Sequence, residues 1–410
     1  MQDLEVAHVA MARADALAGL SEEQGRLTRR SYTDAMRHAN AEVAPWMRAA
    51  GMDVLQDAAG NLVGRYAASH PGTKTLILGS HLDTVRDAGK YDGPLGILVA
   101  LAAVDHLNRL GRRLPFAVEI ICFADEEGVR FGSAYLGSTV VAGTFDRSYL
   151  DLRDDDGISL AEALRTFGGD PDTLEAAARR PEELVGYCEV HIEQGPVLEA
   201  HDLPVGVVSG IAGQSRIGVA LTGAAGHAGT VPMDLRRDAL CAAAEFVLAV
   251  EALARREPGL VATVGQLSAA PGASNVIPGA VSLTLDVRHA ENAVRERACR
   301  SLQGRLDAIA RAREVHAEWQ AVQETGAVAC APGLSRLLEQ AIEQAGYPAH
   351  RLVSGAGHDA VAMADVTPVA MLFVRCQGGI SHNPAESVAV EDVAVAISVL
   401  RRFLDLVASA

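Results

Sequence analysis

The chain has 410 residues, of which 49% are hydrophobic and 21% are charged, and its formal net charge is −16 at pH 7. This length and composition predict a globular protein with room for two domains, each with its own core. Lysine and arginine are scattered, which argues against a surface for nucleic acid or an anionic membrane. The start has no basic segment followed by an apolar run, no run is long enough to span a membrane, and the six cysteines form no C-x-x-C pair. We therefore expect a cytoplasmic protein with reduced cysteines.

The first half of the chain alternates between predicted helices and strands, as in an α/β domain. Apolar residues at helical spacing or in one long run predict three helices, at 6–20, 32–50 and 96–110. Short apolar or β-branched runs predict strands at 54–55, 62–63, 76–78, 116–123 and 187–194. The run at 116–123 is apolar enough for a central parallel strand. Residues 151–180 are polar and acidic and predict a surface excursion.

The character of the chain changes near Gly210. From there, strands and helices follow the order βαββαβ over residues 214–221, 237–254, 261–267, 281–288, 291–311 and 315–322. Two helices on one face of such a unit make a small α+β sandwich that can stand as an inserted domain. A helix, a strand and a closing helix follow at 334–344, 370–375 and 390–406. We expect one α/β domain from residues 1–209 and 327–410, and an inserted domain from residues 210–326.

Residues of metal-binding type follow the predicted strand at 76–78. His81 stands where that strand ends, and Asp83 lies on the same side of an extended chain. We expect its carboxylate to accept the second imidazole N–H, as is usual for a metal-bound histidine. Asp92 precedes a glycine turn and offers another carboxylate. By itself, this segment fits a polar strand end as well as a metal site.

Four more such residues stand after other predicted strands. Glu126 and Glu127 follow the strand at 116–123, and adjacent carboxylates beside an apolar core are costly unless a cation is near. His191 stands at the end of the next strand, and His382 lies in a glycine-rich loop; a lone histidine of either kind is more often structural. With the preceding segment, these residues form a mixed imidazole and carboxylate set that suits Zn²⁺ or Mn²⁺. A shared aspartate would let two such ions activate one water molecule.

Six short motifs, which together span almost the whole chain, carry a resemblance to a known family. In chain order they are Gly79-Ser-His-Leu-Asp-Thr, Tyr91-Asp-Gly, Asp125-Glu-Glu-Gly, Glu189-Val-His-Ile-Glu-Gln-Gly, Gly226-His-Ala-Gly-Thr and Ser381-His-Asn-Pro-Ala-Glu. In these motifs the chain resembles the M20 metallopeptidase-like amidases of the hydantoinase/carbamoylase branch. That branch holds allantoate amidohydrolases, N-carbamoyl-L-amino-acid hydrolases and β-ureidopropionases. The resemblance implies an α/β metal-binding catalytic domain with an inserted α+β (βαββαβ) domain that acts as a lid and forms a homodimer.

The resemblance also implies a centre with two divalent ions, Zn²⁺ or Mn²⁺. One ion would be held by His81, Asp92 and His191, and the other by Asp92, Glu127 and His382. Glu126 would be the base that acts on the water between the ions. Asp83 would support His81 from behind, as the spacing of the two residues already suggests.

Further residues are implied to meet the substrate. His227 of the inserted domain would reach the partner subunit's site and polarise the scissile carbonyl, while Asn275 and Arg288 would hold the substrate. Lesser contacts are expected from Gln194, Gln214 and Arg216. Without the resemblance, these residues would be interpreted as a capped loop and surface ion pairs.

The implied reaction is the hydrolysis of a ureido C–N bond in a small acid. Residues 122–131 and 354–384 look more like allantoate amidohydrolases, which favours allantoate, with ureidoglycine, ammonia and carbon dioxide as products. N-carbamoyl-L-amino acids and N-carbamoyl-β-alanine are the alternatives. A peptidase of the same superfamily is less favoured, since His191 stands where many peptidases carry a carboxylate. A catalytically silent binding protein is also less favoured, since it would have no need of Glu126.

Overall fold

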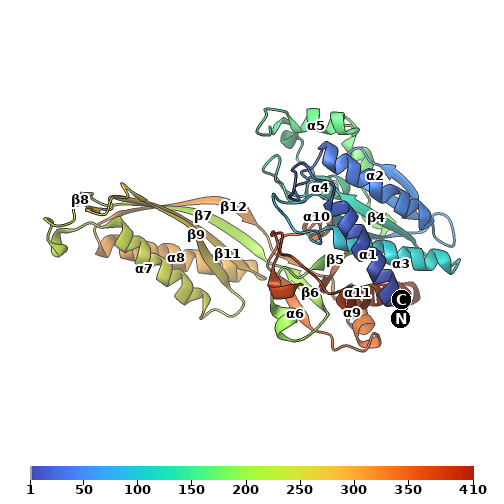
Figure 1. Ribbon diagram of the computed structural model, residues 1–410. Helices are drawn as coiled ribbons and strands as arrows, with labels where there is room; N and C mark the ends of the chain where they lie inside the picture. The colour runs from blue at the N-terminus through green and yellow to red at the C-terminus, as the bar shows by residue number, and fades with distance from the viewer. Residues whose placement is uncertain (1) are drawn as a thin grey trace. The chain divides into compact units, whose positions relative to one another are not determined.

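The computed structural model describes residues 2–410, which divide into two compact units (Figure 1). One unit comprises the chain up to Ser209 together with Cys330–Ala410, and the other is Gly210–Ala329. Both contain helices and strands, so the predicted α/β class is confirmed. The second boundary falls at Ala329 rather than at residue 326, and the short strand that ends there, β13 (Val328–Ala329), pairs with the end of β6 (Val205–Ile211).

The first unit is built on a mixed sheet whose strands follow the order β1-β2-β4-β3-β5-β15-β6, with β14 also paired to β6. The remaining strands are β1 (Asp53–Gln56), β2 (Leu62–Tyr66), β3 (Thr75–His81), β4 (Ala117–Phe123), β5 (Leu184–Ile192), β14 (Arg351–Ser354) and β15 (Val369–Val374). Strands β4, β3, β5 and β15 run parallel, whereas β1, β2 and β6 are antiparallel to their neighbours. The carboxyl ends of the four parallel strands therefore meet at one edge of the sheet.

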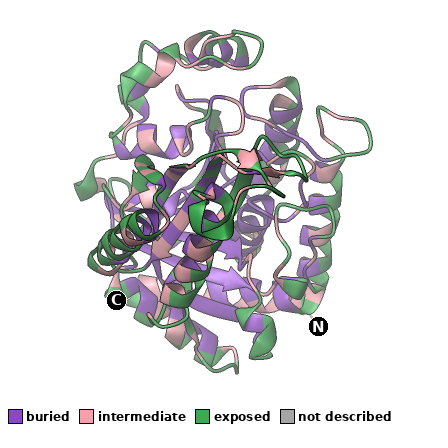
Figure 2. Ribbon diagram, turned by 90° about the vertical axis from the view of Figure 1, so that its left-hand side faces the viewer, coloured by how far each residue is buried: buried purple, intermediate pink, exposed green. Residues whose placement is uncertain are grey.

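Helices cover this sheet because its central strands are apolar on both faces. Every residue of β3, β4 and β15 is buried, and Figure 2 shows the buried strands enclosed by helices with exposed outer surfaces. Alternate residues of β3 and β4, such as Leu76, Leu78, Val118 and Ile120, share one core with the five longest helices of this unit. These are α1 (Gln2–Ala18), α2 (Asp34–Ala49), α3 (Pro94–Arg109), α9 (Pro332–Gln344) and α11 (Val390–Ser409).

Shorter elements complete the first unit. Helices α4 (Leu136–Ala142) and α10 (Ala360–Met363) contact each other, and between them they contact β4, β5 and β15. The acidic excursion contains α5 (Leu160–Phe167) and short 3₁₀ turns, and the other short helix is α6 (Val197–Ala200). Within residues 2–410, no helix is both long and apolar enough to cross a membrane.

The second unit has the expected βαββαβ order. Its elements are β7 (Gly213–Thr222), α7 (Ala239–Ala254), β9 (Val261–Ala270), β11 (Ala280–His289), α8 (Asn292–Ala312) and β12 (His316–Thr325). The sheet order is β12-β7-β11-β9, with all neighbours antiparallel. The buried residues that alternate along β7 and β11 pack on α7 and α8 in a core of their own. A separate two-stranded ribbon joins β8 (Gly226–His227) to β10 (Val276–Ile277).

Candidate metal centre

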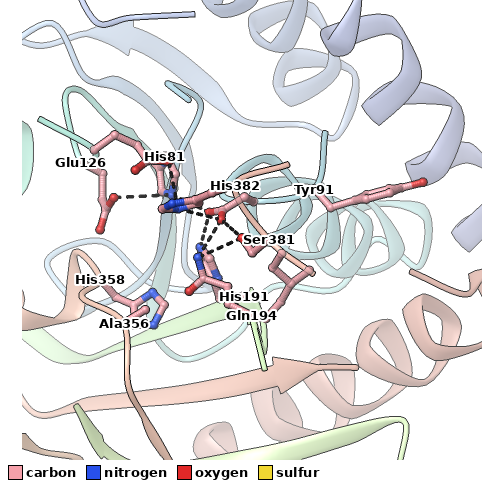
Figure 3. A network of polar contacts seen from close by, with 12 residues as sticks. His81, Tyr91, Glu126, His191, Gln194, Ala356, His358, Ser381 and His382 are labelled. Atoms are coloured by element: carbon pink, nitrogen blue, oxygen red, sulfur yellow. Dashed lines mark hydrogen bonds and ion pairs between the residues drawn. The ribbon is translucent and has the colours of Figure 1, made fainter. Parts of the chain in front are cut away.

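Polar side chains converge where the parallel strands of the first unit end (Figure 3). His81 is the last residue of β3, His191 is the next to last of β5, and Glu126 follows β4. Asp92 lies in the loop that leads into α3, and His382 lies in the loop after β15. Four of these side chains are buried, whereas that of His382 is 50% exposed. The local sequence thus places ionisable side chains at the edge of an apolar sheet.

Asp92 is the centre of the cluster. Its Oδ1 lies 3.2 Å from Nε2 of His191 and 3.6 Å from Nε2 of His81. Its Oδ2 lies 3.4 Å from Nε2 of His382. In Figure 3 the three imidazoles point toward one another. One carboxylate therefore faces three histidines that come from three separate loops and strands.

The two glutamates stand beside this carboxylate. An oxygen of Glu126 lies 3.8 Å from Nε2 of His81, and an oxygen of Glu127 lies 3.7 Å from Nε2 of His382. Two sets of three ligand atoms each lie within 4.8 Å of one another, from His81, Asp92 and His191 and from Asp92, Glu127 and His382. The structure thus brings together both ligand sets that the resemblance implies.

The tautomers of two histidines test whether a metal fits. Nδ1 of His81 lies 2.9 Å from the backbone oxygen of Asp83, and Nδ1 of His191 lies 3.0 Å from that of Ile192. A carbonyl oxygen can only accept, so each Nδ1 carries a proton and each Nε2, which faces Asp92, is left to carry a second proton or to offer its lone pair to a metal ion. Facing acceptors in a buried site need a proton or a cation between them. A divalent ion between Asp92 and the two histidines would meet this need, and the donor set suits Zn²⁺ or Mn²⁺.

Burial and charge set the protonation of the acids in the cluster. Burial would raise the pKa of Asp92, but the imidazoles, with His191 first, outweigh it and hold that pKa well below its usual range. Burial raises the pKa of Glu126 well above its usual range. Burial and the charge of Asp92 raise the pKa of Glu127 to about 7. A carboxyl group that holds its proton this strongly is suited to acid and base work.

Asp83 differs from the expectation. Its backbone carbonyl, and not its carboxylate, accepts the Nδ1 proton of His81; the nearer carboxylate oxygen lies 3.7 Å away. The carboxylate instead accepts the backbone N–H groups of Glu126 at 3.4 Å and Glu127 at 3.1 Å. The prediction was wrong because β3 ends at His81, so strand alternation no longer fixes the next two residues. Asp83 therefore fixes the turn that carries both glutamates.

Three side chains around Asp92 complete the centre. Gln194, expected as a substrate contact, donates to Oδ2 of Asp92 at 2.7 Å, and Ser381 donates to the same oxygen at 2.5 Å. The buried Glu386 accepts the backbone N–H groups of Tyr91 and Asp92 at 2.8 and 3.1 Å. No role was predicted for Ser381 or Glu386 from the sequence. Their only signal was their place in the same motif as His382.

A second buried histidine lies behind His191. The rings of His358 and His191 are 4.6 Å apart and meet edge to face, and a ligand atom of Glu189 lies within 4.8 Å of both. Nε2 of His358 lies 2.8 Å from the hydroxyl of Ser354. Burial, with the charge of His191, lowers the pKa of His358 well below its usual range. His358 is therefore a neutral ring that packs against His191 at the centre, and no role was predicted for it from the sequence.

In the second unit, three predicted substrate contacts gather around one carboxylate. Arg288 binds both oxygens of Asp286, at 2.8 and 3.1 Å. Gln214 donates to Asp286 at 2.5 Å, and Arg216 lies 3.4 Å from it. Adjacent registers of β7 and β11 bring them together, since Arg288 pairs with Gln214 and Asp286 with Arg216.

The other two predicted contacts form a separate pair. His227 pairs with Val276 in the β8 and β10 ribbon, and the N–H of Ala228 donates to the backbone oxygen of Asn275 at 2.9 Å. Nδ1 of His227 accepts the N–H of Gly229 at 3.0 Å, so the neutral ring carries its proton on Nε2. His227 is exposed and can donate that proton to an oxygen acceptor.

Asn275 and Arg288, which were both expected to hold the substrate, do not lie side by side in one chain. Arg288 pairs at the start of β7, whereas β8, which pairs next to Asn275, follows the end of β7. The ten residues of β7 span about 30 Å at about 3.3 Å per residue. The two groups of predicted contacts therefore lie at opposite ends of the inserted unit, as the position of β8 in Figure 1 also illustrates.

Residues 77–406 match peptidase family M20/M25/M40. The chain belongs to this family. Enzymes of the family bind divalent metals, in agreement with the ligand clusters described above.

Individual relatives place the chain more closely within the family. An N-carbamoyl-L-amino acid amidohydrolase of Geobacillus stearothermophilus is 44% identical over 92% of both chains. A probable allantoate deiminase of Oryza sativa subsp. japonica is 42% identical over 96% of this chain and 87% of that relative. The crystal structure of an amidase of the hydantoinase/carbamoylase family from Burkholderia multivorans covers 97% of each chain, at 32% identity and a TM-score of 0.92. The predicted branch is thus confirmed, and the M20 chain is a hydrolase of the amidohydrolase type.

We expect metal content to follow the two ligand sets. After treatment with EDTA and reconstitution with Zn²⁺ or Mn²⁺, the wild type should hold two ions per chain, measured by inductively coupled plasma mass spectrometry. His382→Ala and His81→Ala should each weaken a different one of the two sites, since each residue serves one set only. His201→Ala changes a histidine outside the cluster and should leave the content unchanged. Full hydrolytic activity in the absence of any transition metal would contradict the metal centre.

Proposed function

We propose that the chain is a metal-dependent hydrolase of the ureido C–N bond in a small acid, with allantoate as the favoured substrate. The observation that carries the proposal is the buried carboxylate of Asp92, which faces three imidazoles and has Glu126 beside it. The names of the relatives support a ureido substrate, since both classes act on compounds with a carbamoyl group on nitrogen. Similarity in residues 122–131 and 354–384 favours allantoate.

The residues divide the chemistry between them. Bound Zn²⁺ or Mn²⁺ would polarise the ureido carbonyl and lower the pKa of a water molecule. One ion would be held by His81, Asp92 and His191, and a second by Asp92, Glu127 and His382. Glu126, as a carboxylate, would take a proton from the attacking water and pass it to the leaving nitrogen, because burial raises its pKa and so makes the carboxylate a stronger base. The carboxylate of Asp83 accepts the backbone N–H of Glu126 and so keeps Glu126 in place.

Arg288 is the proposed anchor for the substrate carboxylate. Its guanidinium is a planar fork that matches a carboxylate, and it already binds Asp286 in this way. Gln214 and Arg216 meet the same aspartate and would support the anchor.

We further propose a homodimer in which the inserted unit is a lid and His227 serves the partner's site. His227 and Asn275 lie at the end of the unit opposite Arg288, so one copy of the unit cannot apply both ends to one small substrate. Two copies of the unit related by a twofold axis can do so, since each site then receives the Arg288 end of one copy and the His227 end of the other. The Nε2 proton of His227 would then polarise the scissile carbonyl.

The second candidate substrate class is N-carbamoyl-L-amino acids. It is favoured by the relative that is 44% identical and carries that name. N-carbamoyl-β-alanine is a third option of the same chemistry. A cytoplasmic location stays a prediction from the sequence.

Glu126→Gln tests the proton transfer. The amide cannot take a proton, so turnover should fall on the order of a hundredfold or more, while both metal ions and substrate binding remain. The neighbouring Glu127→Gln is the matched control, because it should lose metal. Steady-state kinetics and metal analysis of both variants separate the two roles. A Glu126→Gln variant as active as the wild type would sink the assignment.

Subunit mixing tests the role of His227 in the partner's site. His227→Ala and Glu126→Gln homodimers should each be almost inactive. After exchange in equal amounts, half of the dimers are hybrids with one intact site, so about a quarter of wild-type activity should return. No recovery despite subunit exchange, followed by native mass spectrometry, would count against the role in trans.

The substrate is tested by comparing kcat/KM for allantoate, N-carbamoyl-L-amino acids and N-carbamoyl-β-alanine. A site that pairs the second ureido group of allantoate should disfavour substrates without it on the order of a hundredfold or more, because its polar groups would lose their partners. Ammonia release, or release of the free amino acid, measures each reaction. A clear preference for an apolar N-carbamoyl amino acid would refute allantoate and leave the metal chemistry intact.

A further inference from the structure

Arg29 is a charged side chain that is completely buried in the first unit. Its Nε donates to the backbone oxygen of Leu82 at 2.7 Å. Its Nη1 donates to the backbone oxygens of Leu17 at 2.6 Å and Leu20 at 3.0 Å, and its Nη2 has no hydrogen-bond partner. A buried guanidinium that binds carbonyl groups keeps its full charge, and a fold retains such a charge at a large desolvation cost. This cost calls for a nearby charge of opposite sign.

The charge of opposite sign is that of Asp83, which lies in sequence between Leu82 and Thr84, two residues to which Arg29 donates. Burial lowers the pKa of Arg29 to about 10, and the charge of Asp83 opposes that effect. The guanidinium is therefore positive at neutral pH. Asp83 is also the residue whose carbonyl accepts the His81 proton and whose carboxylate accepts the N–H groups of Glu126 and Glu127.

The backbone around Arg29 is tied to the same loop. The N–H of Thr84 donates to the backbone oxygen of Arg29 at 2.9 Å, and the N–H of Arg29 donates to the hydroxyl of Thr84 at 3.0 Å. Farther along, the N–H of Ala88 donates to the backbone oxygen of Leu27 at 2.8 Å. Residues 27–29, here called the strap, thus lie along the chain that runs from His81 toward Asp92.

We propose that Arg29 is a positioning residue for the catalytic centre. Its guanidinium fixes the Leu82 peptide and balances the charge of Asp83, and Asp83 in turn sets His81 and the turn that carries Glu126 and Glu127. The strap holds the same loop from the backbone side. The inference rests on the proposed roles of Glu126 and the metal ligands, and it assigns the N-terminal segment a part in the chemistry.

Two substitutions separate the effect of the Arg29 charge from the effect of its planar, forked guanidinium group. Arg29→Met keeps a long side chain and removes the charge, whereas Arg29→Lys keeps a charge and loses the fork. Arg30→Met is the matched control, because the neighbouring Arg30 bonds to Glu22 at the surface of the same segment.

We expect Arg29→Met to lower kcat about tenfold or more with little change in KM, since small displacements of catalytic groups slow turnover. In the metal-free protein, the amides of residues 124–128 should exchange hydrogen faster. In the cobalt-substituted protein, the visible spectrum should shift. Arg29→Lys should recover part of each effect, and Arg30→Met should match the wild type in all three.

The inference is overturned if folded Arg29→Met has wild-type kcat, amide exchange and cobalt spectrum. It is also overturned if activity falls only in proportion to the unfolded fraction measured by circular dichroism. Should Arg29→Met fail to fold, Arg29→Lys decides: an unchanged spectrum and exchange rate contradict the inference, and a shift in both supports it. Amide exchange and the cobalt spectrum are measured without a substrate. Failure of the proposed function would instead be seen as a wild type that is inactive on every ureido acid, so it is distinguishable from failure of this inference.

Discussion

The structure depends on one buried carboxylate. Asp92 faces three imidazoles, and these hold its pKa well below the usual range although burial opposes them. Its oxygen Oδ2 also accepts hydrogen bonds from Gln194 and Ser381. These partners come from segments far apart in the sequence, so they meet only if β3, β5 and β15 lie parallel with their ends at one edge. The sheet topology is thus the condition for the charge distribution of the site.

This constraint explains what could be predicted from the sequence. Apolar runs predict buried strands, and a polar residue directly after such a run must lie at the sheet edge, which places His81, Glu126 and His191. The same reasoning fails two residues later. Asp83 lies beyond the end of β3, where the chain turns and its carboxylate meets the Glu126 and Glu127 amides instead of the imidazole. His382 lies in a loop after β15, so its position on a strand could not place it, and only its residue type and the family resemblance connected it to the site.

The inserted unit shows a second limit of sequence reasoning. The βαββαβ order follows from periodicity, because strands and helices of this length differ in their apolar spacing. Periodicity does not reveal which residues meet a common substrate. Arg288 and Asn275 are close in sequence, yet a strand that carries one away from the other puts them at opposite ends of the unit. Residues that act together across two copies of a chain leave no local pattern in one copy.

Burial of so many ionisable groups makes the centre costly without a cation. Nδ1 of His81 and of His191 donates to a backbone carbonyl, so each Nε2 that faces the ionised carboxylate of Asp92 must hold a proton when no metal ion is bound. Contact with Asp92 accordingly raises the pKa of His382 to about 9, although burial opposes this. A group whose pKa is raised holds its proton below that value, so an incoming ion must displace protons at neutral pH. Protons and a divalent ion therefore compete for the same buried groups near Asp83. Binding of the ion neutralises the carboxylates and releases the protons.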